Sequence, residues 1–288
     1  MHVTDFLANS ADQTALMVGT VAALVSALVG VFTVVRGQSF AGHSFADIGA
    51  AGGSGAVLIG LNPLAGFVAM NLVAAGIMDA IGIRRPHGRD LATGIVLGAA
   101  LGLAALFLYL DTTYTTYSNA TQTILFGSIY TLLPDVVPWI VGLAAASVAG
   151  ILLLYRPLLL SSISSDLAQA QGVPVRVVGL AYIALLALAA SLSSMTVGAI
   201  LSTALLIGPA AAGLRLTARP GLAAAVAAAI GVGTVWLALL LAYDSWYWIP
   251  DHRSLPVSFV LVSLVFVVYL LADLATRIPT TSQTVPTT

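Results

Sequence analysis

His43 and Asp47 stand four residues apart in a stretch that is otherwise apolar enough to cross a membrane. An ionisable side chain in a span is energetically costly and usually has a function, and residues four apart share one face of a helix. An imidazole with a carboxylate suits Zn, Mn or Fe(II). The spacing therefore predicts a two-ligand metal site. A structural ion pair at the end of the span is the alternative.

The other three histidines are weaker candidates for metal binding. His2 is near the N-terminus and His87 lies in an arginine-rich stretch, so both are expected to be solvated. His252 follows Asp251 in a polar stretch, where it is either a contributor to metal entry or an ordinary loop residue. The chain has no Cys and five Met, which excludes disulfides and thiolate sites and argues against a Cu(I) path.

The elements that carry these residues are those of a polytopic membrane protein. Of 288 residues, 59% are hydrophobic and 7% are charged, far from the composition of a soluble domain. Runs of about 20 apolar residues are long enough to cross a bilayer. They predict an all-α transmembrane helical bundle with nine spans, give or take one. The predicted spans are 14–35, 40–61, 63–83, 91–110, 137–154, 177–194, 197–214, 222–243 and 257–274.

The remaining segments complete the predicted organisation. Residues 122–133 are too short to cross and predict a re-entrant or interfacial helix. Residues 1–279 are predicted to form a single transmembrane domain, and the polar tail 280–288 is predicted to be disordered. The arginines alternate between span ends, which predicts an outside N-terminus and a cytoplasmic C-terminus.

Two glycine-rich stretches lie within the predicted spans. The first follows the ionisable residues and contains Gly49, Gly52, Gly53 and Gly55. The second has four-residue spacing and consists of Gly94, Gly98 and Gly102. Small residues let membrane helices approach closely, so the second stretch predicts a packing face. The first stretch is expected instead to thin the side-chain cover and leave room for an ion pathway.

Four local matches resemble the permease subunits of bacterial zinc, manganese and iron ABC importers. The first is VVRGQSFAG at 34–42, and the second is LFGS at 125–128. The third is SSDLAQAQGVPV at 164–175. The fourth, VGAILSTALLIGPAA at 197–211, is long and specific. The resemblance covers most of the chain, roughly 14–271.

Two departures from the family pattern bear on function. The family has Asp before His at the positions where this chain has His43 before Asp47. Both orders place an imidazole and a carboxylate on one helical face, so metal binding survives the exchange while the choice of metal stays open. In the third match, Ser164 and Ser165 replace the family's Asp-Pro, and Asp166 stands where Glu is usual.

The resemblance implies a non-catalytic permease subunit that moves Zn, Mn or Fe into the cytoplasm across the bacterial inner membrane. It implies no tightly bound cofactor and no nucleic-acid partner. A separate ABC ATPase would supply the energy, an extracytoplasmic binding protein would supply the metal, and two permease subunits in a homodimer would form the path. In agreement, the sequence contains no Walker-type phosphate loop and no common hydrolase motif.

The same resemblance makes residues 161–176 a cytoplasmic segment that couples to the ATPase. Asp166, Leu167, Ala168 and Gly172 are the implied coupling residues, with Leu167 and Ala168 as apolar anchors and Gly172 as a helix stop. Two other hypotheses remain. An ATPase-independent transporter or channel would need more buried ionisable groups than one pair, and a non-transporting scaffold would tolerate loss of both His43 and Asp47.

Overall fold

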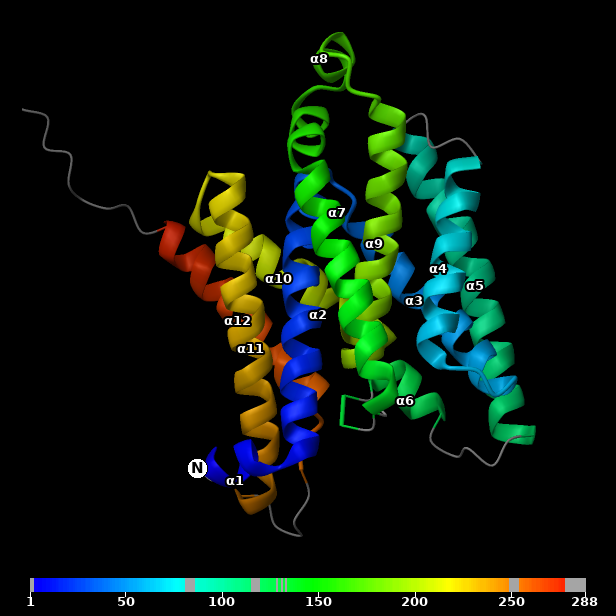
Figure 1. The fold of residues 1–288 in the computed structure, drawn as a ribbon, viewed down its shortest axis with the longest axis vertical. Coiled ribbons are helices and arrows are strands. Elements are labelled where there is room, and N and C mark those ends of the chain that lie inside the picture. Colours follow the sequence, from blue (N-terminus) through cyan, green and yellow to red (C-terminus); the bar gives the residue numbers. More distant parts are fainter. Residues whose placement is uncertain are drawn as a thin grey trace, which may run out of the picture.

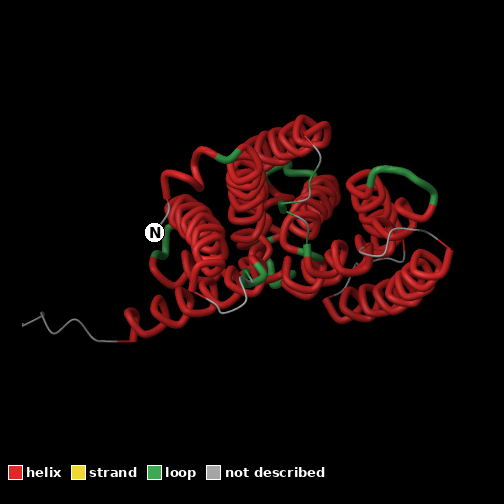
Figure 2. Tube along the Cα trace, turned by 90° about the horizontal axis from the view of Figure 1, so that it is seen from below, coloured by secondary structure: helices red, strands yellow, loops and turns green. Residues whose placement is uncertain are grey.

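The computed structural model describes residues 3–80, 86–114, 120–127, 129, 130, 132, 134–248 and 254–277, and these residues form helices and loops without any strand (Figures 1 and 2). The long helices are α2 (Ser10–Val35), α3 (Ser39–Leu58), α4 (Pro63–Ala80), α5 (Pro86–Tyr114), α7 (Val137–Ile163), α9 (Val175–Val197), α10 (Ala199–Leu216), α11 (Pro220–Trp248) and α12 (Val257–Arg277). The short ones are α1 (Val3–Ala8), α6 (Ala120–Phe126), α8 (Ser165–Ala170) and the 3-10 turn η1 (Pro134–Val136). The predicted all-α class is confirmed.

Eight of the described helices have the length and apolar composition of membrane spans, and α3 is the long helix outside this set. α3 has 20 residues, but His43, Asp47 and its many glycines and serines lower its hydropathy. It packs against α4, α5, α9 and α10, so protein covers much of its polar surface. The prediction of eight or nine spans in a helical bundle is confirmed.

The two largest apolar cores share α2. The larger core joins α2 and α3 to α4, α7 and α9, with Phe32, Phe45 and Tyr182 among its fully buried side chains. The smaller core joins α2 to α10, α11 and α12 around Leu205 and Leu239. In Figure 1, α2 therefore lies between α4 and α5 on one side and α11 and α12 on the other. α2 is the central helix of the bundle.

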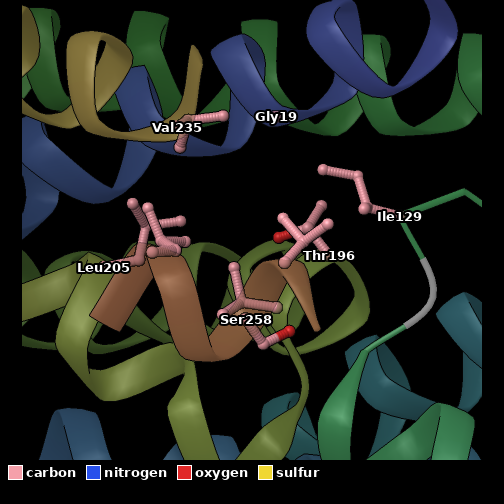
Figure 3. Close-up of a pocket in the computed structure, with 9 residues that line it drawn as sticks. Gly19, Ile129, Thr196, Leu205, Val235 and Ser258 are labelled. Carbon is pink, nitrogen blue, oxygen red and sulfur yellow. The ribbon is translucent and has the colours of Figure 1, made fainter. Parts of the chain in front are cut away.

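The smaller core contains a void of about 10 Å³ (Figure 3). Its lining is mostly aliphatic, with the hydroxyls of Thr196 and Ser258 at one side and Gly19, Leu205 and Val235 around the rest. That volume is about the minimum that holds one water molecule. The void is therefore a packing feature and is too small for a hydrated cation.

Two of the sequence matches meet in space. Gly127 follows α6 and Gly198 separates α9 from α10, and both have positive φ, 93° and 95°. A Cβ on Gly127 would lie 2.7 Å from the Thr196 carbonyl oxygen, and one on Gly198 would collide with the backbone of Phe126. Glycine is required by both the dihedral and the close approach. The Ser258 hydroxyl also donates to the Phe126 carbonyl at 2.6 Å, which fixes the start of α12 at this junction.

The arginine-bearing ends of α2, α9, α10 and α12 lie in the upper half of Figure 1, the half from which α8 projects. Side-chain contacts connect these ends: Arg36 with Ser161 and Ser162, Arg176 with Asp79, and both Arg215 and Arg277 with Asp273. They join the last turns of α2 and α7, the end of α4 to the start of α9, and the ends of α10 and α12. α1 and α6 lie at the opposite end.

Several helices extend beyond the apolar runs that predicted them. α7 continues through Arg156 and Pro157 to Ile163. Leu158 is fully buried, so packing holds these turns although a proline removes one backbone hydrogen bond. α5 starts at Pro86, because proline is favoured in a first helical turn. Within the predicted segment 122–133, residues up to 126 belong to the short helix α6, and the described residues 127, 129, 130 and 132 lie outside any helix.

The expected role of the α3 glycines is wrong. A Cβ on Gly49 would lie 2.7 Å from Phe67, and one on Gly52 would collide with the backbone of Gly66 on α4. Gly55 faces Phe107 on α5, where the added Cβ would lie 3.1 Å from the ring. These glycines let α4 and α5 pack closely on α3, so they leave no room for a pathway.

The expected role of the α5 glycines is also wrong within this chain. A Cβ placed on Gly94, Gly98 or Gly102 meets no atom within 4 Å, and all three residues are exposed. α5 turns a different face toward α3. The four-residue spacing predicted a close contact that the chain itself does not make.

Candidate metal site and coupling segment

The His–Asp pair (His43 and Asp47) lies one turn apart on α3. His43 Nε2 is 3.5 Å from Asp47 Oδ2, and the side chains are 44% and 16% exposed. The helical spacing is as the sequence predicted, and the role in metal binding stays a prediction. An imidazole nitrogen and a carboxylate oxygen that point toward each other, with one side open, could both bond to one cation.

A third residue, Thr203 on α10, completes the surroundings of His43. Its Oγ1 lies 2.9 Å from His43 Nδ1. α10 approaches α3 closely beside the pair. A Cβ on Gly42 would lie 3.0 Å from the side chain of Leu206 on α10. Sequence reasoning missed Thr203, although it lies in the fourth motif match. Its signal was a hydroxyl, next to that of Ser202, in a mostly apolar span.

The described residues contain no cluster of three or more His or Asp side chains that could hold a metal. Structural and catalytic zinc sites have about four ligands, some of them water. One chain therefore offers two ionisable ligands at this site. Further ligands must come from water, from other oxygen donors or from a second chain.

The remaining predicted positions add nothing to the described site. His2 and His252 fall outside the described residues, as do Asp251 and the tail 280–288. His87 lies in the first turn of α5, but its side chain falls outside the described part. The contribution of His252 to metal entry stays a prediction.

The α8 segment (residues 161–176) forms a capped short helix beyond the main bundle (Figure 1). The Leu167 N–H donates to the Ser164 Oγ at 3.2 Å, so Ser164 is the N-cap. After α8, Gly172 has φ of 79°, a conformation common just past a helix end. The helix and its stop therefore form as the sequence predicted.

Within α8 the two expected anchors differ in exposure. Leu167 is 49% exposed, whereas Ala168 is fully buried inside the chain. The expectation that Ala168 presents an apolar surface to a partner is wrong, because its side chain is already covered by this chain. Ala168 instead ties α8 to the bundle, and its carbonyl accepts from the Val173 N–H at 3.0 Å. Asp166 and Leu167 remain exposed candidates for a partner contact.

The sequence profile of the ABC 3 transport family matches residues 10–273. The chain belongs to this family. It is 30% identical over 199 residues to the manganese import system permease protein ScaB of Streptococcus parasanguinis, covering 69% of this chain and 70% of that protein. It is 27% identical over 208 residues to the high-affinity zinc uptake system membrane protein ZnuB of Haemophilus influenzae, covering 72% and 78%.

The fold is also similar to a solved structure, that of PsaBC from Streptococcus pneumoniae in complex with Fab. The TM-score is 0.80 at 24% sequence identity, and the alignment covers 94% of this chain and 95% of that chain. Membership of the ABC 3 transport family confirms the resemblance carried by the four motifs. It makes the chain an integral membrane permease of an ABC transporter.

The other buried carboxylates of this ABC 3 family chain lie near helix ends. Four aspartates outside the His–Asp pair are buried, and the sequence did not single them out: Asp12, Asp111, Asp244 and Asp273. They lie within five residues of a helix end, and Asp273 pairs with two arginines. Carboxylates at helix ends do not form the continuous chain of ionisable groups expected of an ion-coupled transporter.

Two open hollows mark the two ends of this ABC 3 family bundle. At the end that carries α1 and α6, a hollow of about 610 Å³ is lined by Tyr130, Tyr243, Trp246 and Tyr247, among others. Burial, together with the nearby Asp12 and Tyr243, raises the pKa of the Tyr130 phenol, so its hydroxyl stays protonated. At the arginine-rich end, a second hollow of about 570 Å³ lies beside α8.

Proposed function

We propose that this ABC 3 family permease moves a divalent transition metal, Mn, Zn or Fe, into the cytoplasm, with His43 and Asp47 as transient ligands. One observation carries the proposal: an imidazole and a carboxylate share one face of α3, 3.5 Å apart, and the imidazole is 44% exposed. These donors suit such ions, and few protein ligands allow an ion to leave as well as enter. The named functions of the ScaB and ZnuB relatives, manganese import and zinc uptake, support the cargo class.

The exposed side of the His–Asp pair suggests that the site is completed by a second permease subunit. Two copies related by a twofold axis would bring two imidazoles and two carboxylates together, which equals the usual number of ligands for zinc. The number of ionisable ligands in one chain, two, supports this homodimer.

The ATPase and the metal-binding protein would act at opposite ends of the bundle. The end with α8 and the arginines would face the cytoplasm by the positive-inside rule, and an ABC ATPase would hydrolyse ATP there. A metal-binding protein would deliver the ion at the other end, and the N-terminus would be outside. The projection of α8 with the exposed Leu167 supports this orientation.

The test is metal uptake into proteoliposomes that contain the permease, its ATPase and the metal-loaded binding protein. His43→Ala and Asp47→Ala should each lower ATP-driven uptake by at least ~100-fold, beyond the loss typical of residues that only support a ligand. Asp79→Ala is the matched control, because Asp79 is an aspartate in an ion pair at a helix end. The control should keep uptake within about 2-fold, as for most partly exposed ion pairs.

All variants should copurify with the ATPase as the wild type does. Wild-type uptake by both alanine variants would move the metal path away from the pair. Complexes built from one wild-type and one Asp47→Ala subunit, isolated through two different tags, test the dimer. A shared site predicts loss close to that of the full variant, whereas independent sites predict about half of the wild-type rate.

A further inference from the structure

His43 has a partner on each ring nitrogen. Thr203 Oγ1 lies 2.9 Å from Nδ1, and Asp47 Oδ2 lies 3.5 Å from Nε2. A neutral imidazole carries one proton, and only the nitrogen without it has a lone pair to offer a metal. The hydrogen bond made by one nitrogen decides which nitrogen is free. Thr203 is therefore placed to determine how His43 meets a cation.

We propose that Thr203 is a positioning residue for metal transfer. It accepts the Nδ1–H of His43, so that Nε2 keeps its lone pair and faces Asp47. This inference rests on the proposed function, in which His43 and Asp47 bind the ion in transit. A second partner that holds a ligating histidine in one tautomer and one orientation is a common feature of metal sites.

The geometry makes Thr203 a support for His43 and excludes it as a direct ligand alongside Nε2. The two ring nitrogens point to different sides of the imidazole. An ion bonded to Nε2 near Asp47 lies across the ring from the hydroxyl that is bonded to Nδ1. Thr203 acts on the ion only through His43.

Thr234 on another helix provides a contrast with Thr203. The hydroxyl of Thr234 on α11 donates to the carbonyls of Ile230 and Gly231, in the preceding turn of its own helix. That is the ordinary bond of a threonine in a helix. Thr203 instead bonds across to α3. A threonine in a helix divides between two χ1 rotamers, and the bond to His43 Nδ1 places its oxygen in the one that faces α3.

The approach of α10 to α3 fixes the distance between Thr203 and His43. Gly42 stands directly before His43, and a Cβ there would crowd Leu206, one turn after Thr203. At its start, α10 is tied to the Gly127–Gly198 junction. The hydroxyl is thus held by a rigid element, as a positioning group must be.

The experiment compares Thr203→Val, Thr203→Ser and Thr234→Val in the reconstituted transporter. Valine keeps the shape of threonine and removes the hydroxyl, while serine keeps the hydroxyl. Both the maximal uptake rate and the concentration of metal-loaded binding protein at half-maximal rate are measured. Thr203→Val should lower the maximal rate by ~10–100-fold, the usual loss for such a supporting residue. The half-maximal concentration, which reports docking at the far end, should stay unchanged.

Thr203→Ser should restore the rate to within about 3-fold of the wild type, and Thr234→Val, which loses only a bond within its own helix, should stay close to it. Equal losses in Thr203→Val and Thr203→Ser, with less assembled complex, would overturn the proposal and give Thr203 a packing role. A wild-type rate in Thr203→Val would overturn it too. If His43→Ala is inactive in that case, the proposed function stands without this inference. A wild-type rate in His43→Ala would contradict both the proposed function and this inference.

Discussion

The His–Asp pair on α3 and the α8 segment are positioned by opposite means. The pair lies on a helix that packs mainly against α4, α5, α9 and α10, and its imidazole is hydrogen-bonded to a residue 160 positions away. α8 has six residues, lies outside the main bundle and depends on a local cap, a glycine stop and one buried alanine. One region is specified by tertiary packing and the other mostly by local sequence.

The difference implies that damage to the two regions should be separable. Changes at the His–Asp pair should stop the ion while leaving the ATPase docked, since α8 packs on α7 and α9 and the pair lies on α3. Changes on α8 should disconnect the ATPase while leaving the ligands in place. Lesions that abolish both properties together would show that the two regions are one cooperative unit.

Among the variants that test this difference, Leu167→Asp should cause the largest loss of ATPase binding and uptake. A charge at the exposed apolar residue of α8 would disrupt an anchor worth at least ~2 kcal/mol to a docked partner, a factor of ~30. Copurification of the ATPase and ATP-driven uptake should both fall by at least this factor. Metal binding by His43 and Asp47 should be unchanged. It can be measured as the rise in the thermal unfolding temperature of the permease when metal is added.

Two matched variants control that experiment. Gln169→Asp puts the same charge on another exposed position of α8 and should keep both properties, while Leu167→Met keeps volume and apolarity and should behave as wild type. Full copurification of Leu167→Asp would remove α8 from the interface. Leu167→Cys, in a chain without native cysteine, should react with an impermeant thiol reagent only from the cytoplasmic side.

The two regions also differ in what the sequence could predict. Helices, the spacing of the His–Asp pair and the stop of α8 at Gly172 follow from hydropathy, four-residue spacing and helix-stop preferences, all of which are local. Thr203 could not be predicted as the partner of His43, because the two lie on different helices and a hydroxyl in an apolar span does not show which helix it faces. Leu167 and Ala168 are both apolar and adjacent in sequence, and only the tertiary fold determines that the smaller one is buried.

The glycines illustrate the same limit. Four glycines on α3 and three on α5 have the spacing of packing faces, but only those on α3 meet neighbours within the chain. Spacing identifies which residues share a face, while the helix that covers the face is set by the whole bundle. Conversely, Gly127 and Gly198 contact each other, which explains why the second and fourth motif matches occur in the same chain although they are far apart in sequence.

Exchanging the members of the His–Asp pair should have an intermediate effect. His43→Asp with Asp47→His restores the order found in the family and keeps one imidazole and one carboxylate on the same face of α3. Transport should continue at a rate within ~10-fold of wild type, because the donor set is the same while the support from Thr203 then meets a carboxylate. The ratio of manganese to zinc uptake should change. Complete loss of uptake with an intact complex would show that order as well as composition is essential.

Ser164→Ala should have the smallest effect and tests whether α8 is indeed locally specified. Removing an N-cap hydroxyl costs about 1 kcal/mol of helix stability. Docking of the ATPase would offset part of this cost, so uptake should fall by no more than about 3-fold. Ser164→Asp retains a capping oxygen at the N-terminus of α8 and should recover the wild-type rate. Protection of the Leu167 amide from hydrogen exchange should decrease in the alanine variant and return in the aspartate variant. Unchanged protection in Ser164→Ala would mean that the buried Ala168, rather than the cap, holds α8 in place.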